Sequence, residues 1–118
     1  MAAPNIVNVT TILGKTDVQA IGVTATAITT NSAASGKVLK VGTLLISNIT
    51  TSSADVTVDI YRSATAYRVV KSVSVSPGST LNVITKNNPI YLEESDTLRL
   101  TASVASSLEG ICSYEEIS

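Results

Sequence analysis

The sequence contains 118 residues, with 8 lysines and arginines against 9 aspartates and glutamates, and its formal net charge is −1. It has no histidine, tryptophan or phenylalanine and a single cysteine, whereas 44% of its residues are hydrophobic. These features describe one globular domain and exclude an intrachain disulfide. The basic residues are scattered singly and there are only four tyrosines, which argues against nucleic-acid binding.

The N-terminal region alternates apolar and polar residues from Asn5 to Leu13, which predicts a first strand. The alternative is that residues 1–11 form an extended arm that adds to the sheet edge of a neighbouring subunit. Gly14–Asp17, "GKTD", then has the composition of a turn, because glycine tolerates positive φ and aspartate can bond to its own backbone.

The next segments predict two strands joined by a loop. Val23–Thr30 has small side chains that suit an edge strand, and Asn31–Gly36, "NSAASG", reads as a loop. The longest apolar stretch, Lys37–Ile49, predicts a strand in which Gly42 marks a bulge. One face of this strand is expected to carry Val38, Leu44 and Ile46, and the other Leu39, Val41 and Leu45.

The second half of the chain predicts short strands with strict alternation. The first, "DVTVDIYRS", directs Val56, Val58 and Ile60 toward the core. A hairpin loop at Ser63–Thr65 and a Pro-Gly turn at Ser76–Ser79 flank its partner strand. The remaining strands are expected in the segments "TLNVITK", "IYLEE", "TLRLTAS" and "LEGICSYEEI".

No segment shows the 3.6-residue periodicity of an amphipathic helix. Valine, isoleucine and threonine, which dominate the apolar and hydroxyl residues, also fit a pleated surface better than a helix. The sequence therefore predicts an all-β fold in which residues 1–118 form a single antiparallel β-sandwich of about eight strands, jelly-roll or immunoglobulin-like.

The sequence lacks the groups that most enzymes require. Without histidine, neither a Ser-His-Asp nor a Cys-His arrangement can form, and most zinc sites are also excluded. Cys112 alternates with polar neighbours and is interpreted as a small buried hydrophobic residue. We therefore predict no catalytic, cofactor-binding or metal-binding residues, no cofactor, and a protein that is not an enzyme. The N-terminus shows no secretory signal and no stretch is long enough to span a membrane.

One cluster of acidic residues, Glu93, Glu94 and Asp96 in "YLEESDTLRL", calls for two interpretations. Carboxylates in a loop can bind Ca²⁺ or serve a metal-dependent enzyme, but the spacing does not match an EF-hand and Ca²⁺ requires six to eight oxygen ligands. The preferred interpretation is a tight turn between the strands Ile90–Leu92 and Thr97–Ala102. The residues alone leave open whether these acids meet a cation or a basic patch.

Three stretches, "APNIVNVTTILGKT", "GKVLKVGTLLISNIT…ADVTVDIYRS" and "IYLEESDTLRLTAS…LEGICSYEEIS", together resemble small β-sandwich virion proteins of tailed bacteriophages, especially those of marine and cyanobacterial hosts. The resemblance covers most of the chain but consists of strand and turn patterns, and it supplies no site residues. Ser95 stands where such proteins often have glycine.

The resemblance implies a structural protein of the virion, most simply a capsid decoration or cement protein that is made in the host cytoplasm. Its expected partners are other virion proteins, namely the major capsid protein or tail and neck proteins, and further copies of itself, with no nucleic acid and no membrane. The alternatives are a structural component of a tail, neck or fibre, and a module that binds host glycans through Tyr61, Tyr67 or Tyr91.

Overall fold

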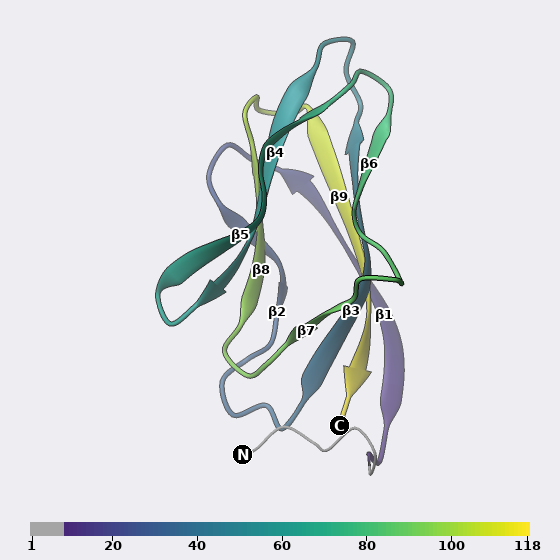
Figure 1. Ribbon diagram of the computed structural model, residues 1–118, viewed down its shortest axis with the longest axis vertical. Helices are drawn as coiled ribbons and strands as arrows, with labels where there is room; N and C mark the ends of the chain where they lie inside the picture. The colour runs from purple at the N-terminus through teal and green to yellow at the C-terminus, as the bar shows by residue number, and fades with distance from the viewer. Residues whose placement is uncertain (1–8) are drawn as a thin grey trace.

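The computed structural model describes residues 9–118, which form nine β-strands in two antiparallel sheets (Figure 1). The strands are β1 (Ile12–Ile21), β2 (Thr26–Thr30), β3 (Val38–Asn48), β4 (Ala54–Arg62), β5 (Thr65–Val75), β6 (Thr80–Ile84), β7 (Ile90–Leu92), β8 (Thr97–Ala102) and β9 (Leu108–Ile117). The predicted all-β antiparallel sandwich is therefore confirmed. No helix in residues 9–118 is long and apolar enough to cross a membrane.

The two sheets have different strand orders. The five-stranded sheet has the order β1-β9-β3-β6, with β7 also pairing with β3, and the four-stranded sheet has the order β2-β8-β4-β5. The molecule is elongated, with extents of 47 × 27 × 20 Å. Because the long strands run along the long axis, most of the connecting loops lie toward the two ends of the sandwich, whereas the β4–β5 hairpin and the β6–β7 connection lie at its sides (Figure 1).

Aliphatic side chains from both sheets fill the space between them. The residues whose side chains are wholly excluded from solvent include Val41, Leu44, Ile46, Val56, Val58, Leu92, Leu98 and Leu100. The core comes close to the backbone at Gly110 of β9, where an added Cβ would lie 2.6 Å from Leu100 Cδ1. The absence of a side chain at Gly110 therefore leaves room for Leu100 of the opposite sheet.

The prediction for the first strand is wrong in one respect. Gly14–Asp17 does not turn but lies inside β1, which pairs with β9 from Ile12↔Ile117 to Ile21↔Leu108 without a register shift. Ten consecutive cross-strand pairs outweigh the local turn preference of "GKTD". The expected strand from Asn5 lies partly outside the described residues.

The described part of the predicted N-terminal arm is attached to the end of the chain. The backbone N–H groups of Thr10 and Thr11 donate to the carbonyl of Ser118 at 2.8 and 2.9 Å, and Ser118 N–H donates to Thr11 at 2.9 Å. Residues 1–8 of the predicted arm lie outside the described residues.

The bulge predicted at Gly42 is present, but its effect on β3 differs from the expected pattern. The pairing with β9 shifts between Val41 and Thr43. The extra residue brings Leu39 and Val41 onto the same buried side as Leu44 and Ile46, all within the core cluster. Leu45 remains on the outer face, and Val38 is buried outside the core cluster.

The strands of the second half follow the prediction closely. Val56 and Val58 are fully buried and Ile60 packs against the core. The turn at Ser76–Ser79 is closed by a 3.1 Å hydrogen bond from Ser79 N to Ser76 O, with Gly78 at a φ of 67°.

Candidate assembly surfaces

The acidic turn between β7 and β8 is built around one buried carboxylate. Asp96 is 1% exposed, and its Oδ2 accepts a 2.8 Å hydrogen bond from the backbone N–H of Glu93. Arg62 lies at the end of β4. Its Nε donates to Asp96 Oδ1 at 2.7 Å, and its Nη2 donates to Asp96 Oδ2. Ser95 adopts a φ of 74°, so the turn takes its left-handed residue without glycine.

The two glutamates of the turn contact different partners. Glu93 forms a 3.1 Å ion pair with Arg62, and Glu94 accepts a 2.7 Å hydrogen bond from the backbone N–H of Gly36. Two backbone hydrogen bonds between Asn31 and the turn complete the attachment to the loop before β3. The predicted turn is confirmed, and the basic group that meets these acids belongs to the same chain. Among the described residues, no group of three or more His, Cys, Asp or Glu side chains could hold a metal ion.

The ion pair changes the acidity of both partners. Burial alone would raise the pKa of Asp96, but the hydrogen bonds from Arg62 and from the Glu93 backbone lower it below its ordinary value of 3.8. The same hydrogen bond to Asp96 raises the pKa of Arg62. Both groups remain charged at neutral pH, so the turn acts as a structural clamp between the end of β4 and the β7–β8 connection.

A second ionic cluster in the larger sheet connects β1, β9 and the residue that precedes β3. Glu116 on β9 contacts Lys37 at 3.0 Å and Lys15 of β1 at 3.2 Å. The hydrogen bond from Lys37 lowers the pKa of Glu116, and Lys15 adds to this effect against the opposing influence of burial. The interaction connects β1 to the segment before β3 across β9.

The single cysteine has the environment predicted from the sequence. Cys112 is fully buried, and burial raises the pKa of its thiol to about 11. The thiol is therefore protonated and shielded at neutral pH, which is opposite to the environment of a reactive cysteine.

The three tyrosines considered for glycan binding do not form one platform. Tyr61 and Tyr67 lie on β4 and β5, whereas Tyr91 lies on β7 of the other sheet. Tyr61 stacks on Arg99, with 4.1 Å between the guanidinium carbon and the ring centroid, and Arg99 in turn bonds to Asp59 at 2.8 Å. The Tyr61 ring therefore covers an ion pair on the outer face of the smaller sheet.

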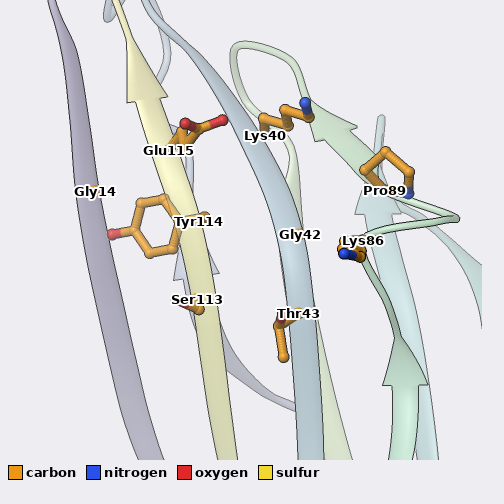
Figure 2. Close-up of a pocket in the computed structure, with 9 residues that line it drawn as sticks. All are labelled: Gly14, Lys40, Gly42, Thr43, Lys86, Pro89, Ser113, Tyr114 and Glu115. Carbon is orange, nitrogen blue, oxygen red and sulfur yellow. The ribbon is translucent and has the colours of Figure 1, made fainter.

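A shallow groove of about 280 Å³ crosses the larger sheet, between β1, β9, β3 and the connection from β6 to β7 (Figure 2). Its charged side chains are Lys40, Lys86 and Glu115, and Lys40 and Glu115 are paired positions on adjacent strands. None of the sequence-predicted candidate residues lines this groove. The groove is open to solvent, and its lining residues include no histidine or cysteine.

The edges of the two sheets differ in a way that bears on assembly. β1 is a ten-residue edge strand whose pairing is regular throughout. Elsewhere in residues 9–118, the edges formed by β2, β6 and β7 have at most five residues each. The long edge strand β5 has two register shifts in its pairing with β4 and a left-handed residue, Ser72, at a φ of 50°. Sequence reasoning missed the open edge because it ended the first strand at Leu13.

Searches of known protein families and of curated proteins find no match to this sequence. Among solved structures, the chain is similar to a protein of Bacillus endospore appendages, a family of disulfide-linked pili. The similarity covers 92% of this chain and 88% of that chain, with a TM-score of 0.53 and 17% sequence identity. At this level of identity, the two proteins share a fold.

This comparison corrects the expected identity. The interpretation as a phage virion protein is wrong, together with the capsid decoration role, the virion partners and the virion location, because a solved structure with the same fold over most of the chain is an appendage protein. The resemblance to virion proteins consisted of strand and turn patterns, which report a β-sandwich and not its use. Of the structural roles considered, the fibre component agrees best with the comparison.

Proposed function

We propose that this protein is the repeating subunit of a fibre, assembled from many copies of the same chain. The observation that carries the proposal is the open edge of β1, which presents ten residues of regular strand to a neighbour. Natural β-proteins normally protect long edges with bulges, prolines or outward charges, because an open edge is a template for another strand. In β1 the Lys15 side chain is engaged by Glu116, and no bulge interrupts the pairing.

The shared fold with an appendage protein supports the same function. In a fibre on a cell or spore surface, as in those appendages, each subunit adds to the next through repeated surfaces and needs no catalytic pocket. The open groove on the larger sheet and the separated tyrosines agree with a protein that functions by binding other copies through its surfaces and the β1 edge.

The assembly proposed here differs from disulfide-linked pili in one respect. The chain has a single cysteine, and Cys112 is fully buried between the sheets. A covalent bond between copies would require the strands around Cys112 to open. We therefore propose that the copies are held together by non-covalent contacts alone.

Electron microscopy of the purified 118-residue chain tests the fibre function. Filaments of constant width should appear above a critical concentration, whereas a protein that stays monomeric in sedimentation experiments at all concentrations would contradict the proposal.

Proline variants test the role of the β1 edge. N–H groups of adjacent residues in an edge strand point alternately to the neighbouring strand and to the open side. Of Lys15→Pro and Thr16→Pro, one should therefore lose stability, and the other should fold normally but fail to form filaments. Filaments formed by the variant that folds normally would show that copies associate elsewhere.

A further inference from the structure

Charged residues are distributed unequally between the two ends of the sandwich. The loops at the end far from the C-terminus connect β1 to β2, β3 to β4, β5 to β6 and β8 to β9 (Figure 1). Their sequences are "GVTA", "ITTSS", "SPGS" and "SVASS", and none contains a charged residue. We call these four loops the uncharged end. The loops at the opposite end, between β2 and β3 and between β7 and β8, contain Lys37, Glu93, Glu94 and Asp96.

The uncharged end also exposes aliphatic side chains. Val23, Ile49 and Val104 each lie in a different loop and are 56%, 58% and 52% exposed. Serine, threonine and glycine surround them, so the surface offers apolar contacts without a charge that would have to be desolvated. An exposed apolar surface of this kind indicates a contact site.

Backbone hydrogen bonds hold the four loops in one arrangement. Ala102 N–H donates to Gly22 O at 2.8 Å, and Ile49 N–H donates to Ser107 O at 3.0 Å. The β5–β6 turn is attached in the same way, since Gly78 N–H donates to Asn48 O at 3.0 Å. The uncharged end is thus organised before any partner binds, which lowers the entropy that binding must overcome.

We propose that the uncharged end of one copy binds the N-terminal segment, residues 1–8, of the next copy. This segment, "MAAPNIVN", also has no charged side chain and contains several apolar residues, so the two surfaces match in chemistry. The inference rests on the proposed fibre function and specifies one contact between its subunits.

The position of the segment requires a second copy. The described chain begins with Val9, and Thr10 and Thr11 are bonded to Ser118, at the opposite end from the four loops. Eight residues span at most about 29 Å when fully extended, whereas the molecule is 47 Å long. A contact between the start of one copy and the far end of another is heterologous, and repeating it without closure produces a filament.

Charge-introducing variants test the contact through assembly. Ile49→Glu and Val104→Glu should each raise the critical concentration for filament formation by about tenfold or more, because a carboxylate would enter an apolar contact. Tyr67→Glu is the matched control, since Tyr67 is 59% exposed but lies on β5 beside the β4–β5 hairpin, away from the four loops of the uncharged end. Equal assembly of all three variants would overturn the proposal and leave the fibre function intact.

Cross-linking tests the contact without filaments. An affinity-tagged Ala3→Cys protein is mixed with untagged Val104→Cys protein, oxidised, and analysed on a non-reducing gel. A disulfide-linked pair of tagged and untagged chains should form, and it should form far less with Tyr67→Cys in place of Val104→Cys. Equal yields from both partners, or linkage with Thr16→Cys on the β1 edge instead, would show that the segment binds elsewhere. If the wild-type protein forms no filaments, the fibre function fails, and this experiment still decides the contact.

Discussion

Arg62 Nε donates a 2.7 Å hydrogen bond to Asp96 Oδ1, which connects the end of β4 to the turn between β7 and β8. The carboxylate is almost completely buried, and the same arginine also reaches Glu93. Two of the three acids in this cluster, Glu93 and Asp96, are therefore paired with an arginine of their own chain. Their role is to fix the geometry of one end of the sandwich.

Replacing Asp96 should weaken the fold substantially. Asp96→Ala removes the paired hydrogen bonds from Arg62 and the bond from the Glu93 backbone, so we expect the free energy of unfolding to decrease by about 2–3 kcal/mol. Urea denaturation monitored by circular dichroism measures this change. Glu93→Gln is the control, because the Glu93 side chain is 68% exposed and its pairing should contribute less than about 1 kcal/mol. Equal losses in both variants would contradict the assigned role of Asp96.

Stability should decrease in acid. The pKa values of Asp96 and Glu116 are lower in the folded protein than their ordinary values of 3.8 and 4.5. Below these ordinary values the unfolded chain binds more protons than the folded chain, so the stabilisation present at neutral pH is lost as the pH decreases through the folded pKa values. Urea unfolding between pH 7 and pH 2 measures this dependence. Asp96→Ala should show a shallower decrease, and an unchanged slope would argue against the contribution of Asp96.

Cys112 should not react in the folded protein. Its thiol is buried, and its pKa is raised to about 11, so both access and thiolate formation are suppressed at pH 8. Ellman's reagent should modify Cys112 only after denaturant is added, and Val104→Cys should provide a rapidly reacting second thiol for comparison.

Because Cys112 is buried and unreactive, filaments should dissociate in denaturant without a reducing agent. Filaments that dissociate only when a reductant is present would contradict non-covalent assembly.

Gly110 should not tolerate a side chain. A Cβ at this position would lie 2.6 Å from Leu100 Cδ1 and 3.4 Å from Ile28 Cδ1, so Gly110→Ala should destabilise the fold by about 1–3 kcal/mol. Thermal and urea unfolding measure the loss. Gly14→Ala is the matched control, because no atom lies within 4 Å of an added Cβ there. Adding Leu100→Val to Gly110→Ala should recover part of the lost stability, because the shorter side chain relieves the close contact. If the double variant instead loses the sum of the two single-variant losses, the contact with Leu100 is not the cause of the destabilisation.

Local patterns predicted the segments whose structure depends on their neighbours in sequence. The turn between Ile90–Leu92 and Thr97–Ala102 was predicted with the bounds that β7 and β8 have. Its hydrogen bonds between Glu93 and Asp96 span only three residues, so the sequence contains the information needed. The bulge at Gly42 and the turn at Ser76–Ser79 follow from the same kind of signal.

Long-range pairing decided the rest. "GKTD" has the composition of a turn, yet Gly14–Asp17 is held in β1 by residues of β9 almost one hundred positions later in the chain. Arg62 could not be recognised as the partner of Asp96, because 34 residues separate them. The uncharged end was also hidden, since its four short loops are dispersed along the sequence and meet only when the two sheets pack together.

The sequence by itself determined the all-β sandwich, the aliphatic core, the buried cysteine and the lack of histidine-based chemistry, because composition and two-residue alternation are properties of short segments. Only the tertiary structure decided which strand edge stays open, which charges neutralise one another and which end carries none. These depend on the order of strands in the two sheets, and strand order is set by contacts between residues that are distant in the chain.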